Sequence, residues 1–267
     1  MQAVILAAGR ARRLGPVGEK LPKCLLRIEG RALIEYSLDN LVQGGVSGIT
    51  IVTGHCSEAI QRAVGTRHLG IPVHYRFNPY YHDTGSVVSL LLGAGEIIAP
   101  NLLVVESDIL YHPRFIDAVM SSADDTIMVA DASGSGDEVF VCRGTDNRLV
   151  FLGKNATRLQ RERSIGEYAG IARLSAGLCQ VYCRHAERLL AAGRANGHYE
   201  DLIFTLAQLG QDVGVCHCPS LPWGEVDTLE DLDRARDEVY PELRRLWEAR
   251  AETARIARPV NESPRAG

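Results

Sequence analysis

The stretch MQAVILAAGRARRLGPVGEKLPKCLL, residues 1–26, decides the fold of this chain. Residues 4–6 are an uninterrupted apolar run, which is typical of a buried strand. Ala7, Ala8 and Gly9 follow with almost no side chain, so a ligand can approach the backbone and its N–H groups can hold phosphate oxygens. Basic residues, including Arg13 and Lys23, crowd the segment that comes next. A polyphosphate would relieve the repulsion among these charges, so we expect a strand that ends in a phosphate-binding loop.

Two common phosphate-binding motifs do not fit this stretch. A Walker loop requires GxxxxGK[ST], which does not begin at Gly9, and a dinucleotide fingerprint requires GxGxxG, where Ala11 and Leu14 replace the second and third glycines. The stretch instead resembles the signature of the sugar-phosphate nucleotidyltransferases, LxAGxGxR followed by PK. Ala11 departs from it, because it stands where that family usually has its second glycine. The matching residues are Leu6, Ala8, Gly9, Arg13, Pro22 and Lys23.

The composition restricts the class of protein. Of the 267 residues 46% are hydrophobic, enough to bury a sizeable core in one large α/β domain or two small ones. The formal net charge of −4 argues against a nucleic-acid-binding surface over the whole chain. No apolar run is long enough to span a membrane, the N-terminus lacks the layout of a signal peptide, and none of the seven cysteines forms a CxxC pair. These features predict a cytoplasmic protein with no nucleic-acid partner and no membrane partner.

Strand and helix patterns alternate along the chain. Apolar or alternating runs predict strands at residues 24–28, 49–52, 73–77, 102–105, 126–130 and 213–218, and helical spacing predicts helices at 33–42, 57–64, from 86, 178–190 and 199–209. Residues 139–142 and 149–152 have the pattern of a hairpin. Strands that alternate with helices predict right-handed crossovers. The expected fold is therefore α/β, with a Rossmann-like, mainly parallel sheet, helices on both faces, a small β-hairpin insertion and a C-terminal helix.

Two acidic motifs stand at predicted strand ends that are far apart in the sequence. ESD, residues 106–108, follows an apolar strand, and EVDTLEDL, residues 225–232, contains a TxxD capping box. Ligands of parallel sheets bind beyond the carboxyl ends of the strands, so an acidic residue there, facing a phosphate-binding loop, is a candidate Mg²⁺ ligand. In the nucleotidyltransferases the corresponding motifs read [GE]xD and E[IV]DTxEDL. The resemblance implies that Asp108 and Asp227 bind Mg²⁺.

The resemblance covers residues 1–238 and is greatest to the small cytidylyltransferases that activate phosphocholine or phosphonates such as 2-aminoethylphosphonate. It implies a reaction in which CTP and a small phosphonate or phosphomonoester give a CMP-linked product and pyrophosphate. Arg13 and Lys23 would neutralise the triphosphate and the departing pyrophosphate. Both residues are expected on an exposed loop, where they contribute little to packing. The acceptor is already ionised, so we assign no general base.

The nucleotide is expected to contact mainly backbone groups. A helix that begins at Gly85-Ser86 presents unpaired N–H groups to an anion. In the resembling family the segment NxxY…SL borders the nucleotide, and the residues that match it here are Asn78, Tyr81, Ser89 and Leu90. The predicted nucleotide-binding residues are Leu6, Ala7, Ala8, Gly9, Gly85, Ser86 and Ser89.

The acceptor is expected between the α-phosphate and side chains that come mostly from the later half of the chain. Lys154 suits an anionic head, and aromatic rings and carboxylates suit a cationic tail. A wholly anionic phosphonate stays open, because Arg76 and Arg158 could serve it together with the same lysine. A structural interpretation stays open for three of these residues: Lys154 and Glu167 suit exposed strand ends, and Glu200 suits the first turn of a helix. The predicted acceptor-binding residues are Tyr81, Lys154, Glu167, Tyr199, Glu200 and Trp223.

We expect one nucleotidyltransferase domain over residues 1–238, with an acceptor-side insertion at about 131–175. A helical extension is expected at 239–252 and a frayed tail at 253–267. Two other functions stay open, a sugar-1-phosphate nucleotidyltransferase that uses another NTP and a non-catalytic nucleotide-sensing protein. The presence of Lys23, Asp108 and Asp227 argues against the sensor, and the sequence leaves a homodimer open.

Overall fold

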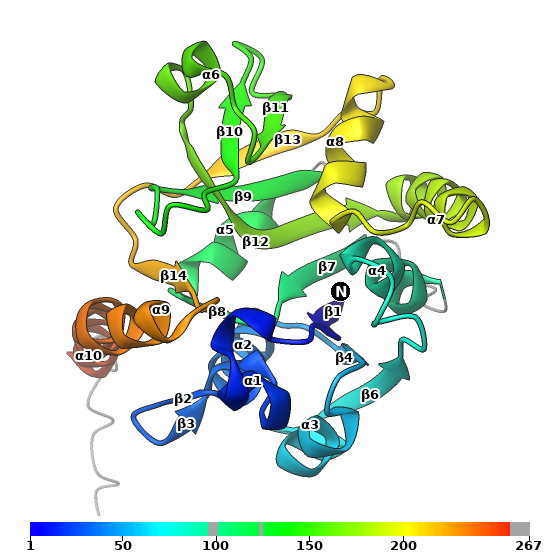
Figure 1. Ribbon diagram of the computed structural model, residues 1–267. Coiled ribbons are helices and arrows are strands. Elements are labelled where there is room, and N and C mark those ends of the chain that lie inside the picture. The colour runs from blue at the N-terminus through cyan, green and yellow to red at the C-terminus, as the bar shows by residue number, and fades with distance from the viewer. Residues whose placement is uncertain (96–100, 123–124, 257–267) are drawn as a thin grey trace, which may run out of the picture.

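The predicted first strand lies at the centre of the sheet. Strand β1 (Gln2–Ala7) pairs in parallel with β4 (Gly48–Thr53) on one side and with β7 (Asn101–Glu106) on the other. Its apolar residues are fully buried on both faces, as a central strand requires. The computed structural model in Figure 1 describes residues 1–95, 101–122 and 125–256, and side chains to residue 248.

The sheet has a parallel centre. Its strand order is β11-β10-β12-β7-β1-β4-β6-β5, and β6 (Ile71–Phe77) continues the parallel pairing beyond β4, before the short β5 (Arg67–His68). Helices α2 (Leu33–Gln43), α3 (Ser57–Val64) and α4 (Ser86–Ala94) connect these strands. The predicted Rossmann-like, mainly parallel arrangement is confirmed for these central strands.

The other half of the sheet is antiparallel. The long strand β12 (Gly166–Ser175) runs against both β7 and β9 (Thr126–Ala130), and β9 pairs in parallel with β13 (Gly214–His217). The predicted hairpin is present as β10 (Phe140–Arg143) and β11 (Leu149–Gly153). It extends the sheet from β12 and stands above the central strands in Figure 1.

Short elements complete the chain. After β1 come the 3₁₀ turns η1 (Arg12–Leu14) and η2 (Lys23–Leu25), on either side of α1 (Pro16–Lys20). The predicted strand 24–28 is wrong over most of its length, because only β2 (Arg27–Ile28) is extended, and it pairs with β3 (Arg31–Ala32). The remaining elements are β8 (Ile109–Tyr111), α5 (Arg114–Ser121), α6 (Arg158–Glu162), α7 (Ala176–Ala191), α8 (Tyr199–Gln208), β14 (Trp223–Glu225), α9 (Leu229–Arg234), the π-helical η3 (Ala235–Val239) and α10 (Tyr240–Ile256).

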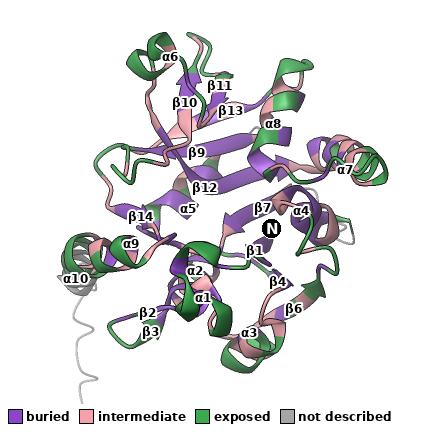
Figure 2. Cartoon of the chain, viewed as in Figure 1, coloured by how far each residue is buried: buried purple, intermediate pink, exposed green. Residues whose placement is uncertain are grey.

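The core consists of two layers, one on each face of the sheet. Because side chains alternate along a strand, Val4 and Leu6 pack with α4, α7 and α8, whereas Ile5 packs with α2, α3 and α5. Figure 2 shows the buried strands and the exposed outer surfaces of helices such as α3, α6 and α7. No helix in the described part of the chain is long and apolar enough to cross a membrane.

A third apolar cluster ties the C-terminal helix to the first loop. Leu14 from η1 and Leu243 from α10 are buried in the same cluster, and Trp247 stacks on Tyr36 with 6.0 Å between ring centroids. The helix predicted at 239–252 is therefore present and packed. Of the predicted frayed tail, 253–267, the first four residues belong to α10, and residues 257–267 lie outside the described residues.

Candidate active site

A cavity of about 540 Å³ lies beyond the carboxyl ends of β1 and β7, where ligands of parallel sheets bind. Its lining comes from widely separated parts of the chain. These are residues 6–13, 22–24, 78 and 81–86, Ser89, 106–108, Val139, Lys154, Tyr168, Asn196, 198–200, Glu225 and Asp227. All seven predicted nucleotide-binding residues are among them, as are Arg13, Lys23, Asp108 and Asp227.

The loop after β1 has the tight geometry that its small residues predict. Ala11 adopts φ 51° and ψ 34°, in the left-handed region that costs a residue other than glycine about 1–2 kcal/mol. This backbone conformation is the physical reason why the nucleotidyltransferase signature has glycine at the position that Ala11 occupies here. The loop is also closely packed, because a Cβ added at Gly18 would lie 2.1 Å from the Ala11 carbonyl oxygen.

The second segment predicted to contact the nucleotide is the start of α4. Gly85 donates its N–H to the Ala195 carbonyl at 2.9 Å, and a Cβ added there would lie 2.0 Å from the Gly197 carbonyl oxygen. Ser86 accepts a hydrogen bond at 2.9 Å from the N–H of Tyr199, the first residue of α8. The starts of two helices are thereby joined at the edge of the cavity.

Lys23 joins the two predicted metal-binding carboxylates. Its Nζ lies 2.9 Å from Asp108 Oδ2 and also donates a short hydrogen bond to Asp227 Oδ1. Burial alone would lower the pKa of Lys23, but the two aspartates outweigh it and raise that pKa above its usual value. The expectation of an exposed lysine is wrong, because 21% of its side chain is exposed and it lies between two carboxylates.

Asp227 is brought to this site by β14 and by the cap of α9. Strand β14 pairs with β8 so that Glu225 lies opposite Ile109, and the Val226 N–H donates to the Asp108 carbonyl at 2.9 Å. The predicted capping box is confirmed, since Thr228 and Asp231 exchange hydrogen bonds at the start of α9. Arg13 Nη1 then binds Asp227 Oδ2 at 2.6 Å. Arg13 and Lys23 thus hold the two oxygens of one carboxylate.

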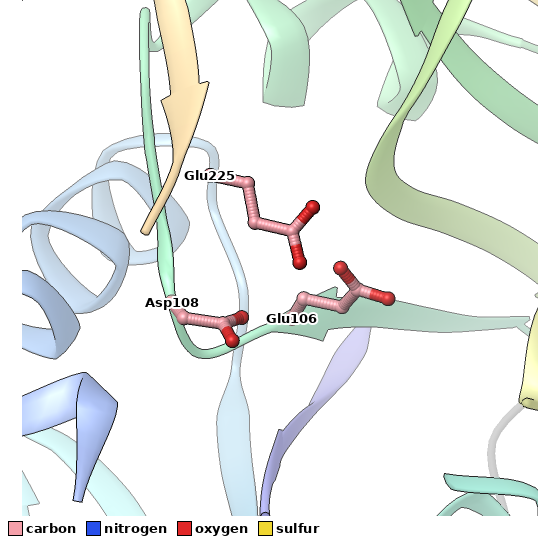
Figure 3. Close-up of side chains that lie close together, drawn as sticks. All are labelled: Glu106, Asp108 and Glu225. Carbon is pink, nitrogen blue, oxygen red and sulfur yellow. The ribbon is translucent and has the colours of Figure 1, made fainter. Parts of the chain in front are cut away.

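Three carboxylates, those of Glu106, Asp108 and Glu225, point toward one another, as Figure 3 shows. Each offers an oxygen, and these oxygens lie within 4.8 Å of one another. Burial, followed by the neighbouring acids, raises the pKa of Glu225 to about 8 and the pKa of Glu106 well above its usual value. Sequence reasoning missed Glu106 and Glu225 as site residues. The signal was present, because each stands two residues before a predicted metal ligand and residues two apart in an extended segment share a face.

These acids can hold a divalent cation. The set offers only oxygen donors, which Mg²⁺ prefers, and the raised pKa values of Glu106 and Glu225 mean that burial and the neighbouring acids disfavour their charged forms without further charge compensation. A proton or a cation would supply that compensation.

The far end of the cavity combines aromatic and acidic groups. Tyr199 and Tyr168 are buried, and their hydroxyl oxygens lie 2.5 Å apart. Glu200 is also buried, its Oε2 has no hydrogen-bond partner among the described residues, and burial raises its pKa. Tyr81 and Lys154 line the same cavity. Tyr168, which follows the predicted Glu167 in the sequence, lines it as well.

Two predicted acceptor-binding residues do not line the cavity. Glu167 precedes Tyr168 on β12 and so points to the opposite face, where its Oε2 accepts a hydrogen bond from the Ser133 N–H at 2.7 Å. Trp223 donates its indole N–H to the Asp131 carbonyl at 2.9 Å. The side chains of both residues therefore anchor the segment after β9, and the structure does not bring them to the cavity.

Comparison with known proteins agrees with this geometry. A family model described as the MobA-like NTP transferase domain matches residues 3–169. A CMP-5'-(3-aminopropyl)phosphonate synthase of Streptomyces rubellomurinus is 29% identical over 130 residues, which are 49% of this chain and 20% of that protein. A choline-phosphate cytidylyltransferase of Streptococcus pneumoniae is 33% identical over 111 residues, which are 40% of this chain and 44% of that protein.

Solved structures share the fold. The inositol-1-phosphate CTP transferase from T. maritima superposes with a TM-score of 0.76 at 20% identity, over 92% of this chain and 96% of that chain. The CTP:phosphocholine cytidylyltransferase from Streptococcus pneumoniae gives a TM-score of 0.73 at 21% identity, over 88% of this chain and 97% of that chain. The first curated relatives are matched over 20% to 55% of their own length.

Proposed function

Because this chain belongs to the MobA-like NTP transferase family, we propose that it is a cytidylyltransferase that transfers CMP from CTP to a small phosphonate or phosphomonoester and releases pyrophosphate. The observation that carries the proposal is the meeting of Arg13, Lys23, Asp108 and Asp227 in one cavity. We assign the activity to residues 1–238, with the acceptor side formed in part by residues 131–175.

The proposed reaction needs charge neutralisation and alignment rather than covalent catalysis. An oxygen of the acceptor attacks the α-phosphorus in line with the departing pyrophosphate, so negative charge must be stabilised along the triphosphate. Lys23 and Arg13 supply two cations at the mouth of the signature loop. The backbone of Ala7, Ala8 and Gly9 and the start of α4 supply N–H groups. An ionised phosphonate or phosphate attacks without a general base.

Mg²⁺ fits the acidic residues of this cavity. Asp108 and Asp227 would hold it together with Glu225 or Glu106, because these carboxylates offer hard oxygen donors. When bound, the ion neutralises charge on the triphosphate. Lys23 holds Asp108 and Asp227 together, so the same lysine positions the ligands and contributes charge.

The acceptor we propose is zwitterionic, with phosphocholine and 2-aminoethylphosphonate as first candidates. Lys154 offers a compact positive charge for the phosphate or phosphonate head. At the far end, Glu200 keeps a buried oxygen without a hydrogen-bond partner in the described ranges, and Tyr199 offers an aromatic ring, which suits an ammonium group. A carboxylated tail would meet Glu106 and Glu200, and like charges in a buried site repel strongly.

Pyrophosphate release with four NTPs and a panel of acceptors tests this function. We expect turnover with CTP and a zwitterionic phosphonate or phosphomonoester, and equal turnover of UTP with a sugar 1-phosphate would contradict the assignment. Glu200→Gln should raise the acceptor KM and leave the KM for CTP nearly unchanged. The matched control is Glu187→Gln, because Glu187 is an exposed acid on α7. An unchanged acceptor KM in Glu200→Gln would refute the cationic tail.

A further inference from the structure

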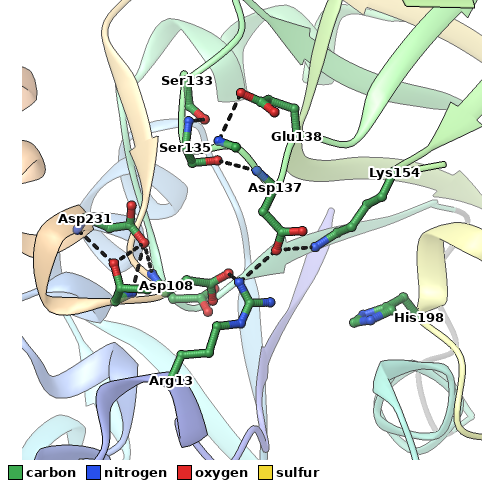
Figure 4. Close-up of polar contacts among 12 residues, drawn as sticks. Arg13, Asp108, Ser133, Ser135, Asp137, Glu138, Lys154, His198 and Asp231 are labelled. Carbon is green, nitrogen blue, oxygen red and sulfur yellow. Dashed lines mark hydrogen bonds and ion pairs between the residues drawn. The ribbon is translucent and has the colours of Figure 1, made fainter. Parts of the chain in front are cut away.

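Asp137 joins two cations of the candidate active site from outside the cavity lining. Its Oδ2 lies 2.7 Å from Arg13 Nη1 and 2.7 Å from Lys154 Nζ, as Figure 4 shows. Arg13 and Lys154 line the cavity and come from opposite sides of it, the signature loop and the segment after β11. A single carboxylate oxygen therefore occupies the position between the two cations.

This carboxylate belongs to a loop with few other attachments. At its start the Ser133 N–H donates to Glu167 at 2.7 Å, and at its end the Tyr168 N–H donates to the Val139 carbonyl at 2.9 Å. Between these anchors, Gly134 and Gly136 have φ of 71° and 83° and have open space around them. In the described part of the chain, residues 134–138 make their hydrogen bonds and ion pairs to other segments through Asp137.

The contact is electrostatic in origin. Partial burial would raise the pKa of Asp137, but the hydrogen bonds from Lys154 and Arg13 outweigh it and hold that pKa below its usual value. The side chains of Asp137 and Arg13 are 40% and 49% exposed, so water screens the pair. An anion that entered the cavity could therefore take the place of the carboxylate without a large penalty.

We propose that Asp137 is a specificity-determining residue that occupies an anion subsite between Arg13 and Lys154 and yields it to a dianionic phosphate or phosphonate, but not to a monoanionic carboxylate. A dianion brings more charge and can bind both cations through different oxygens. A free carboxylate carries the same single negative charge as the side chain of Asp137. It must also compete with that side chain, whose effective concentration on the loop is about millimolar or higher. The subsite deepens the proposed function, since it selects the head of the acceptor.

Ethyl phosphate and propionate are matched probes for this subsite, because at about pH 8 a phosphomonoester with a second pKa of about 6 is a dianion. Hydrogen exchange of the backbone amides of residues 134–138 reports whether the contacts of Asp137 hold the loop in place. We expect ethyl phosphate to speed exchange in the wild-type chain and propionate at equal ionic strength to leave it unchanged. Slower or unchanged exchange with ethyl phosphate, or faster exchange with propionate, would overturn the proposal.

The variant Asp137→Asn removes the competing charge. It should exchange rapidly without any anion and should bind ethyl phosphate about two- to tenfold more tightly than the wild type, the range expected for two partly exposed ion pairs. Glu138→Gln on the same loop is the control and should behave as the wild type. Equal or weaker binding by Asp137→Asn would refute the competition. Neither readout needs CTP, so a chain that shows both effects but forms no product would refute the proposed function alone.

Discussion

Replacing Lys23 by methionine should destabilise the fold as well as abolish nucleotidyl transfer. The Lys23 ammonium lies 2.9 Å from Asp108 and also binds Asp227, and the two carboxylate side chains are 16% and 10% exposed. Methionine keeps much of the apolar stem and removes the charge. The variant therefore leaves two largely buried acids beside Glu106 and Glu225 without their shared cation.

The expected loss in the free energy of unfolding follows from the number of these contacts and from their exposure to water. A hydrogen bond to a charged group contributes about 1.5–3 kcal/mol, and water that reaches the partly exposed site recovers some of it, so we expect a loss of about 1–3 kcal/mol. For a chain of this size that corresponds to a Tm lower by about 3–10 °C. The exposed Lys20 on the same segment provides the control Lys20→Met, which should change neither Tm nor turnover.

The pH dependence separates charge from packing. The raised pKa of Lys23 gives stability that is complete below the ordinary lysine pKa of about 10.4, so Lys23 itself does not titrate between about pH 5.5 and 8.5. The pKa of Glu225 is raised to about 8, so this acid is protonated at about pH 5.5 and no longer repels Asp108 and Asp227, and the Tm loss in Lys23→Met should shrink there. Adding Asp108→Asn to Lys23→Met should restore part of the Tm at about pH 8.5. A loss that is equal at both pH values, or no loss at all, would refute the electrostatic account.

Three further predictions concern the same cavity. Asp108→Asn and Asp227→Asn should each lower kcat/KM for pyrophosphate release in Mg²⁺ by about 100-fold or more, and normal turnover in either would exclude that carboxylate as a ligand. The pKa of Glu225 is raised to about 8, so the preference of the fold for the protonated acid gives stability that is complete below about pH 4.5 and is lost as the pH rises through 8. Mg²⁺ should therefore raise Tm more at about pH 8.5 than at about pH 5.5, as a thermal melt series can show. Gly85→Ala should lower Tm by an amount equivalent to about 1–3 kcal/mol, because the added Cβ would lie 2.0 Å from the Gly197 carbonyl oxygen, and an unchanged Tm would contradict that clash.

Most of the fold follows from patterns within single elements. Apolar runs and helical spacing predicted the central strands and helices, because each of these signals depends on neighbours a few residues away. The prediction failed at residues 24–28, where an apolar run forms a 3₁₀ turn that faces the core instead of a strand. There the packing of Cys24 and Leu25 against the sheet decides the backbone, and no local periodicity reports it.

Residues of the candidate site were predictable where a motif specifies both the residue type and its position at the end of a strand. Arg13, Lys23, Asp108 and Asp227 were named from such motifs and meet in the cavity. The placement of Glu167 outside the cavity lining was not predictable, because the face that a strand presents depends on pairing partners that a single sequence does not reveal. Asp137 was not recognised at all, since its contact with Arg13 spans 124 residues and lies in a loop without periodicity.

The distance along the chain between Lys23 and Asp227 has a consequence for biosynthesis. The two residues are 204 positions apart, so at about 5–20 residues per second the ribosome needs about 10–40 s to deliver the aspartate after the lysine. During that interval the nascent chain can pair Lys23 only with Asp108, and β14 cannot yet add to β8. Completion of the proposed triphosphate pocket is therefore a late event in synthesis. A polypeptide released early would carry the glycine-containing loop but lack the carboxylate that both Arg13 and Lys23 bind.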